Sequence, residues 1–336
     1  MVNDWVKKEV KNLYGISPSD VKEIPRGSAE IYLLSQNEHK YIFKVFQQKM
    51  TEERVLKELG ITEHLRNKGF LVPEYIPLQD NSGYYGFTSN KRIAVLQKYI
   101  SGDVLDDNKA TFPQMISMAE LYATLLVALR DYKAELPCFS LDIFSKQSIL
   151  SAIEEAQKFQ LTLLDPDICQ KISDKIEWMY ELLEMKVDFI GDLSFEKSHG
   201  DYNPFQLIFN VEGSGTDVAV LDFASAKVMP VVFELVRCFL FASPGAIDGS
   251  INMDEFVPFV IAFDNLFALN EYDLKYMFYP YYIRSVTNLF GYREYSLTGD
   301  ETFKFLGDQI YNQCNSLHHN IKEYSTQLIT RMKGDV

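Results

Sequence analysis

The sequence predicts an α+β protein with a small N-terminal lobe rich in β-strands and a large, mostly helical C-terminal lobe. Short apolar runs separated by turn residues occupy residues 21–46, which is typical of strands. From residue 112 onward, Leu, Ile, Phe and Met recur at helical spacing. With 336 residues, a hydrophobic fraction of 47% and few Gly and Pro, the chain can fill two lobes. We expect a first lobe over residues 1–98, a connecting hinge over 99–104 and a second lobe over 105–336.

The first lobe should begin with strands at residues 21–24, 31–34 and 41–46, the first two joined by a turn that contains Gly27 and Ser28. Lys44 lies in the third strand, among β-branched and aromatic residues. Because side chains alternate along a strand, its ammonium should point to the face opposite that of its neighbours. The alternative is an ordinary exposed strand lysine.

A helix is expected over residues 51–67, where Val55, Leu59 and Leu65 lie among charged residues and Gly69 follows the last turn. After a turn at residues 80–83, the run at 93–100 predicts another strand. The second lobe should then contain a series of amphipathic helices. Their expected ranges are 112–132, 146–161, 166–186, 253–269, 271–292 and 302–332. Two short strands at 206–210 and 218–222 are expected to form a hairpin between these helices.

Two aspartates beside this hairpin are the strongest chemical signal in the chain. Asp201 lies on a polar loop between Gly200 and Pro204, and Asp222 ends the apolar run that starts at Val218. Phosphoryl transfer from Mg-ATP needs one acid that faces the acceptor hydroxyl and another that holds the metal bridging the phosphates. Asp201 fits the first role and Asp222 the second, because Mg prefers carboxylate oxygen at a fixed position. The pair therefore indicates an ATP-dependent kinase.

The sequence leaves more than one role open for other polar residues near Asp201. In the protein-kinase pattern, an Asn five residues after the catalytic Asp is a second metal ligand. That position holds Gln206 here, whose carboxamide sits on a chain one methylene longer, so a second metal site stays open. Asn203 offers an amide at a different spacing. His199 either orients Asp201 or is a buried, hydrogen-bonded histidine.

These residues resemble the aminoglycoside phosphotransferase and choline kinase superfamily, in which His-Gly-Asp replaces the His-Arg-Asp of protein kinases. The chain after Asp222 is also similar, with Ala226-Lys227, Pro230 and then Phe233-Glu234-Leu235-Val236-Arg237. The resemblance implies a bilobal protein-kinase-like fold. Residues 1–98 would form the nucleotide-binding lobe and 105–336 the catalytic and acceptor-binding lobe. It also implies ATP, or GTP, as phosphate donor, with Mg.

The resemblance further implies roles for residues of the first lobe. Lys44 would grip the α and β phosphates, and Glu58, or else Glu53, would pair with it from the helix. Gly27 and Ser28 would form a hairpin that covers the phosphates, although they are otherwise a simple turn. Adenine would be held by backbone groups of the hinge strand, from the residues Gln97, Lys98, Tyr99 and Ile100.

The composition of the chain indicates which kinds of partner we expect it to bind. The net charge of −14 opposes binding to a phosphate backbone and favours attraction of a cationic acceptor. Neither a secretory hydrophobic core at the start nor an uninterrupted apolar span of bilayer length is evident, so we expect a cytoplasmic protein without a membrane partner. The four cysteines lack paired ligand spacing and should be free thiols: Cys138, Cys169, Cys238 and Cys314.

The acceptor is less well defined by the sequence. Glu271-Tyr272-Asp273 and an aromatic series that follows either line its pocket or pack in the core. The series is Tyr276, Phe278, Tyr279, Tyr281, Tyr282 and Phe290. The superfamily implies aminoglycosides, choline or ethanolamine, homoserine, hexosamines or methylthioribose as acceptors, and we favour an aminoglycoside or related amino sugar.

The sequence leaves two other functions as alternatives. A non-catalytic binding or coat protein with a kinase-like fold would account for Gln206 and for the glycine-poor turn at Gly27. A kinase of polypeptides is disfavoured, because no Gly follows Asp222-Phe223 and no Ala-Pro-Glu motif is present.

Overall fold

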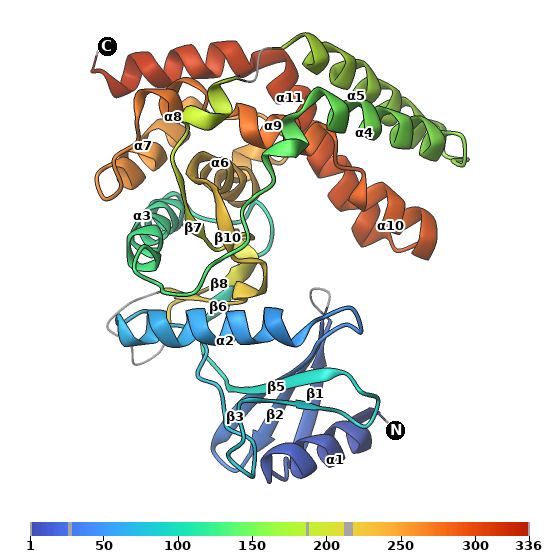
Figure 1. Ribbon diagram of the computed structural model, residues 1–336, viewed down its shortest axis with the longest axis vertical. Coiled ribbons are helices and arrows are strands. Elements are labelled where there is room, and N and C mark those ends of the chain that lie inside the picture. Colours follow the sequence, from blue (N-terminus) through green and yellow to red (C-terminus); the bar gives the residue numbers. More distant parts are fainter. Residues whose placement is uncertain (1, 26–28, 186–187, 212–217, 335–336) are drawn as a thin grey trace. The chain divides into compact units, whose positions relative to one another are not determined.

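The computed structural model describes residues 2–25, 29–185, 188–211 and 218–334. The chain divides into two compact units, coloured by sequence in Figure 1. Unit 1 comprises Met1–Val104 and Gln206–Ala226, and unit 2 comprises Leu105–Phe205 and Lys227–Val336. Unit 1 contains an antiparallel sheet and unit 2 is mostly helical, which confirms the predicted α+β class. Residues 206–226 group with unit 1, whereas the sequence division placed them in the second lobe.

The main sheet of unit 1 is antiparallel, with strand order β1-β2-β3-β5-β4. Its strands are β1 (Asp20–Ile24), β2 (Glu30–Gln36), β3 (His39–Val45), β4 (Tyr85–Phe87) and β5 (Ile93–Lys98). A second sheet joins β6 (Asp103–Val104), β8 (Leu207–Phe209) and β9 (Val218–Val220), followed by the short helix η4 (Phe223–Ser225). The expected hairpin at 206–222 is therefore present as β8 and β9. Its pairing with β6 explains why these residues belong to unit 1.

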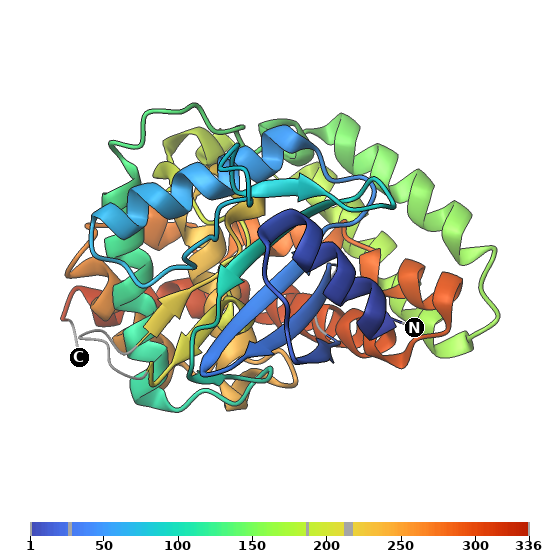
Figure 2. The same ribbon diagram turned by 90° about the horizontal axis from the view of Figure 1, so that it is seen from below.

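Separate hydrophobic clusters lie on the two faces of the main sheet. Helix α1 (Val2–Tyr14) crosses one face (Figure 2), where Val6 and Val10 are fully buried against Phe43. Helix α2 (Glu52–Asn67) supplies Val55 to the other cluster. The sequence analysis did not predict α1, although Val6, Val10 and Tyr14 repeat every four residues. Because Phe43 packs under α1, alternation along β3 directs Lys44 to the α2 side.

Unit 2 is built mainly from helices around one short strand pair. The helices are α3 (Phe112–Leu129), α4 (Lys146–Gln160), α5 (Pro166–Glu184), α6 (Val231–Ala242), α7 (Met253–Asp264), α8 (Glu271–Lys275), α9 (Tyr279–Val286), α10 (Phe290–Thr298) and α11 (Glu301–Met332). Short 3-10 turns are η1 (Leu141–Phe144), η2 (Asp188–Asp192), η3 (Pro204–Gln206) and η5 (Pro244–Ala246). Strands β7 (Phe195–Ser198) and β10 (Lys227–Pro230) pair antiparallel, with Lys227 opposite Ser198.

The helices of unit 2 differ from the predicted ones in two places. The single helix expected over 271–292 is broken into α8, α9 and the start of α10. Pro280 lies in the first turn of α9 and has no amide hydrogen to continue a preceding helix. Helix α6 was not predicted, because Val231–Ala242 is a short and nearly all-apolar run that periodicity cannot distinguish from a buried strand.

Helix α3 is long and apolar enough to cross a membrane by length and composition, with a mean hydropathy of 1.4. Polar residues interrupt its apolar run in the sequence, so it was not predicted as a bilayer-length span. Half of this segment is buried inside the structure, and Met118 and Tyr122 are fully buried. A core helix meets the same criteria, so they carry little weight as a sign of a membrane.

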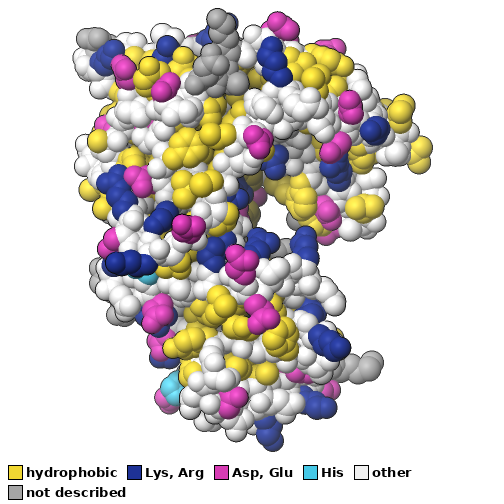
Figure 3. Space-filling view, in the orientation of Figure 1, with side chains coloured by type: hydrophobic (Ala, Val, Ile, Leu, Met, Phe, Trp, Pro, Cys, Tyr) yellow, Lys and Arg dark blue, Asp and Glu magenta, His cyan; other side chains and the backbone are white. Residues whose placement is uncertain are grey.

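The surface drawn in Figure 3 carries charges of both signs. Lys and Arg side chains lie interspersed with Asp and Glu on this face of each unit. A nucleic-acid-binding surface typically gathers basic residues on one face or along one helix. This face has no such single-sign field among the residues drawn in colour.

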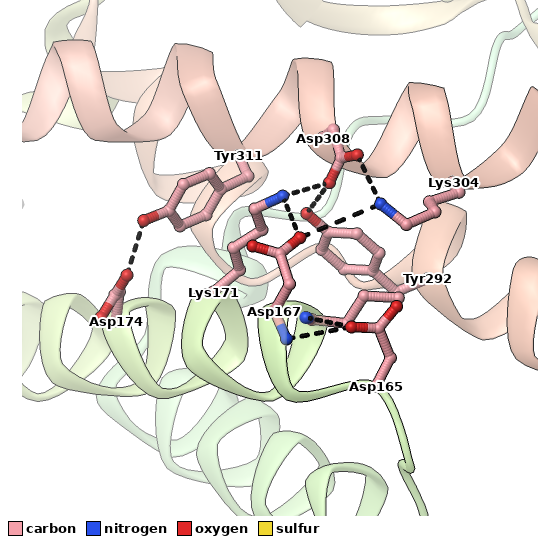
Figure 4. A network of polar contacts seen from close by, with 9 residues as sticks. Asp165, Asp167, Lys171, Asp174, Tyr292, Lys304, Asp308 and Tyr311 are labelled. Carbon is pink, nitrogen blue, oxygen red and sulfur yellow. Dashed lines mark hydrogen bonds and ion pairs between the residues drawn. The ribbon is translucent and has the colours of Figure 1, made fainter.

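A polar network joins α5, α10 and α11 (Figure 4). The Lys171 ammonium lies 2.7 Å from a carboxylate oxygen of Asp167 and 2.7 Å from one of Asp308. Asp308 also pairs with Lys304 at 3.0 Å and accepts a hydrogen bond from Tyr292 at 2.9 Å. Burial alone would raise the pKa of Asp308, but the hydrogen bonds from Lys171, Lys304 and Tyr292 outweigh it and hold this pKa below its usual value.

We expect Asp308→Asn to lower the urea midpoint at neutral pH and to make unfolding less sensitive to acid. A carboxyl whose folded-state pKa is depressed stabilises the fold above its ordinary pKa, and this stability is lost as the pH falls below about 4. The measurement is the urea midpoint from pH 7 to pH 3. Glu323→Gln, at an exposed position of the same helix, is the matched control. Identical acid profiles for the two variants would contradict the role given to Asp308.

Candidate active site

Unit 1 brings together three of the residues singled out from the sequence. The Lys44 ammonium lies 3.2 Å from Oε1 of Glu58 and 3.1 Å from Oδ1 of Asp222. Lys44 comes from β3, Glu58 from the buried face of α2, and Asp222 directly follows the β8–β9 hairpin. Oε1 of Glu58 also accepts a hydrogen bond from the Tyr75 hydroxyl at 3.0 Å. Glu58 rather than Glu53 is therefore the glutamate that meets Lys44.

The electrostatics of this cluster keep Lys44 charged. Burial would lower the pKa of Lys44, but the carboxylates of Glu58 and Asp222 outweigh it and raise this pKa. Lys44 and Glu58 are almost fully buried, whereas the side chain of Asp222 is 39% exposed. Asp222 is thus a partly open carboxylate beside a fixed cation. Such a carboxylate can hold a metal ion that also binds phosphate oxygens.

The backbone at Asp222 is unusual. Its φ of 58° and ψ of 75° lie in the left-handed region, which few residues other than Gly adopt and which Asp tolerates. The Leu221 amide donates to the carbonyl of Gln206 at 2.8 Å, so Gln206 and Asp222 lie at the same end of the hairpin. Within the described residues, no group of three or more His, Cys, Asp or Glu could hold a metal. A metal at Asp222 would therefore need other oxygens, and the Gln206 amide and substrate phosphates are suitable donors.

Asp201 lies in unit 2, on the loop that follows β7. Gly200 before it has a φ of 80°, which requires a glycine or strains any other residue. The Asp201 amide donates to Nδ1 of His199, which is fully buried, at 3.3 Å. His199 is therefore a buried, hydrogen-bonded histidine, and its role in orienting Asp201 stays a prediction. The Asp201 carboxylate forms an ion pair with Arg237 of α6.

Asn203 stabilises this loop through hydrogen bonds within it. Its Nδ2 donates to the Asp201 carbonyl at 2.9 Å and to the carboxylate at 3.3 Å, while its Oδ1 accepts from the Phe205 amide at 2.9 Å. Both ends of the amide are engaged within the loop. This geometry does not favour the suggestion that Asn203 supplies a metal ligand.

Glu234 of α6 is fully buried and holds the same loop through hydrogen bonds. One of its oxygens accepts from the Tyr202 amide at 2.7 Å, and the other accepts from the Ser198 hydroxyl. Burial, together with the charge of Glu234, raises the pKa of the Tyr202 hydroxyl well above its usual value. In the sequence, Glu234 stood out only as part of a motif. Its signal was an acid within a run that is apolar apart from Arg237, which predicts a buried carboxylate with backbone partners.

Strand pairing and hydrogen bonds within unit 1 already engage some of the backbone amides predicted to form the hinge site. The Lys98 amide donates to the Glu74 carbonyl at 2.8 Å, and the Tyr99 amide donates to the Lys40 carbonyl at 3.1 Å. Gln97 is paired with Ile42 of β3. The amides of Lys98 and Tyr99 are thus engaged within unit 1, which leaves the amide of Ile100 among the predicted hinge donors. Gly27 and Ser28 lie outside the described residues.

A comparison with known families agrees with this arrangement. The sequence model of the phosphotransferase enzyme family matches residues 20–255. The chain belongs to this family. The superfamily resemblance carried by the His199-Gly200-Asp201 motif is therefore confirmed, and the protein is a phosphotransferase. No curated protein matches the chain.

Solved structures show that this phosphotransferase shares its fold with small-molecule kinases. A microcompartment-associated aminopropanol kinase is 13% identical, with a TM-score of 0.66, over 95% of this chain and 97% of that one. Aminoglycoside 2′-phosphotransferase-IIIa in its GDP complex is 15% identical, with a TM-score of 0.61, over 94% and 99%. Choline kinase from Cryptosporidium parvum Iowa II is 14% identical, with a TM-score of 0.59, over 93% and 92%.

Some of the residues suggested to line the acceptor pocket of this phosphotransferase serve its core, whereas Glu271, Tyr272 and Phe290 are exposed. Asp273 is fully buried and accepts from the Ser194 amide and hydroxyl at 2.8 and 2.6 Å. Phe278, Tyr281 and Tyr282 are buried as well, as the core interpretation requires. Tyr276 is only partly buried and stacks on Phe189 with 3.9 Å between ring centroids.

We expect Glu234→Ala to destabilise this phosphotransferase by about 2–4 kcal/mol, because the Tyr202 amide and the Ser198 hydroxyl would be left buried without their acceptor. Glu234→Gln keeps one acceptor oxygen and should lose less. The measurement is urea unfolding of both variants and the parent. An alanine variant as stable as the parent would show that Glu234 does not anchor the loop.

Proposed function

We propose that this phosphotransferase transfers the γ-phosphate of ATP, or GTP, to a hydroxyl group of a small molecule, with Mg bound at Asp222 and Gln206. The observation that carries the proposal is the buried Lys44–Glu58 pair, whose ammonium faces the partly exposed carboxylate of Asp222. A fixed cation beside a metal-competent carboxylate is the arrangement that phosphoryl transfer requires at the phosphates. When bound, Mg would neutralise charge on the phosphate oxygens.

Each residue then has a defined task in the proposed reaction. Lys44, held by Glu58, binds phosphate oxygens as a point charge. Asp201 orients the acceptor hydroxyl and accepts its proton, while the His199 and Asn203 contacts fix the loop that carries it. The hinge at Ile100 supplies a backbone donor for the adenine ring.

The acceptor first suggested by the sequence is an aminoglycoside or related amino sugar. Its support is the net charge of −14 and the shared fold with kinases of aminoglycosides, aminopropanol and choline. Choline or ethanolamine, homoserine and hexosamine are the alternatives.

The test combines phosphate transfer with nucleotide binding. Transfer from labelled ATP is measured across acceptors of these classes, and thermal unfolding is followed with and without Mg-ATP. A bound nucleotide stabilises the fold by mass action, by about 3 kcal/mol at a hundredfold excess over its Kd. A non-catalytic kinase-like binding protein, which Gln206 in place of Asn would suit, should bind an acceptor without transfer. Absence of both a thermal shift and transfer would defeat the proposed kinase.

A further inference from the structure

Three basic side chains of unit 2 lie close to one another, and one of them contacts the catalytic loop. Arg237 of α6 forms an ion pair with Asp201. Lys227 begins β10 and lies directly across from Ser198, three residues before Asp201. Arg284 lies on α9, one turn after Tyr281, and its charge acts on Lys227. Helix α9 packs on α6, so all three cations belong to one region of the unit.

Two of these cations have no hydrogen bond or ion pair within the described ranges of the chain: the Lys227 ammonium and the Arg284 guanidinium. Burial lowers the pKa of Lys227, and the charges of Arg237 and Arg284 lower it further against the opposing carboxylates of Glu234 and Asp201. Lys227 is half-buried, and a half-buried cation without a partner is costly unless it serves in binding. Arg284 is exposed, so its guanidinium is accessible to a ligand.

The carboxylates in this region are already engaged. Glu234 accepts from the Tyr202 amide and the Ser198 hydroxyl, and Asp201 is paired with Arg237. Among the described residues, the charges that act on Lys227 are those of two carboxylates and two further cations, so this group is net positive in a chain whose net charge is −14. An acceptor with several ammonium groups would meet like charges here.

We infer that the acceptor carries an anionic group, a carboxylate or a phosphate, close to the hydroxyl that is phosphorylated. Lys227 and Arg284 bind this group, and Arg237 positions Asp201. Hydrogen bonds between a guanidinium or ammonium and an oxyanion are roughly twice as strong as neutral ones and fix orientation. The inference rests on the proposed kinase function and narrows its acceptor class away from aminoglycosides.

The phosphates of the nucleotide are another source of the same chemistry. Lys44 and the metal-competent Asp222 already provide for those phosphates in unit 1. If Lys227 and Arg284 served the nucleotide instead, their loss would raise the KM for ATP. If they serve the acceptor, their loss raises the KM for the acceptor and leaves the KM for ATP unchanged.

The experiment uses the full chain and three matched hydroxyl compounds: glucuronate, glucose and glucosamine, which are anionic, neutral and cationic. Binding is measured by calorimetry in saturating Mg-ATP analogue, and transfer by coupled ADP release. We expect glucuronate to bind about tenfold more tightly than glucosamine, the ratio that one charge-assisted hydrogen bond supplies. Arg284→Gln and Lys227→Gln should each remove most of this preference, and Arg284→Glu should reverse it. Lys322→Gln, at an exposed position of α11, is the control.

The outcomes separate the two proposals. Tighter binding of glucosamine, no detectable binding of glucuronate, or a rise in the KM for ATP alone would overturn the anionic acceptor and leave the kinase intact. If Mg-ATP does not raise the unfolding temperature of the parent protein, the kinase proposal itself is wrong. The same shift in every variant shows that the variants fold.

Discussion

Asp201→Asn should lower the rate of phosphate transfer about 10³-fold and leave binding of Mg-ATP unchanged. Asn has the same shape as Asp but cannot accept the proton of the acceptor hydroxyl. The nucleotide contacts proposed here lie in unit 1, at Lys44 and Asp222, and the substitution does not touch them. The measurement is kcat for transfer together with the thermal shift by Mg-ATP.

The Asp201→Asn variant also affects Arg237, and this effect on stability can be measured separately. Its guanidinium would lose a charged partner when Asp201 becomes Asn, and an unpaired buried cation destabilises the fold. Arg237→Gln alone and the double variant complete a cycle that separates this cost from catalysis. Asp142→Asn, at an exposed position of η1, is the matched control. Transfer by Asp201→Asn at the parent rate would remove Asp201 from the reaction.

The sequence predicted those parts of the site in which a short segment fixes its own geometry. Alternation along β3 placed Lys44 on the face opposite Phe43, whereas the partner Glu58 was implied only by the family resemblance. Gly200 needs its positive φ regardless of the rest of the fold. These features depend on local backbone rules, so one sequence sufficed to predict them.

Other features depend on packing between distant segments and were not predictable in this way. Glu234 acquires its role only when α6 packs beneath a loop more than thirty residues earlier in the chain. The aromatic residues after Glu271 have helical spacing whether they line a pocket or fill the core, and burial decides for the core at Phe278 and Tyr281. The cations Lys227, Arg237 and Arg284 come from three elements whose meeting no spacing rule describes.

The second large effect is expected at Asp222. Asp222→Asn should lower transfer about 10³-fold and raise the Mg concentration needed for half-maximal rate, because one anionic oxygen ligand is lost where the metal would neutralise phosphate charge. Lys44 would keep Glu58, at 3.2 Å, as its remaining carboxylate. The amide should also tolerate the left-handed backbone at this position, since Asn adopts it as readily as Asp. Stability in urea should therefore change little.

Glu58→Gln is the comparison that isolates the metal. It removes the other carboxylate from Lys44, so it should weaken binding of the phosphates without changing the Mg requirement. Asp222 would still face Lys44 at 3.1 Å in that variant. If both substitutions shift the Mg dependence equally, the two carboxylates act only through Lys44, and the metal lies elsewhere. If only Asp222→Asn shifts it, the partly exposed carboxylate of Asp222 is the metal ligand, and the buried carboxylate of Glu58 serves to hold Lys44.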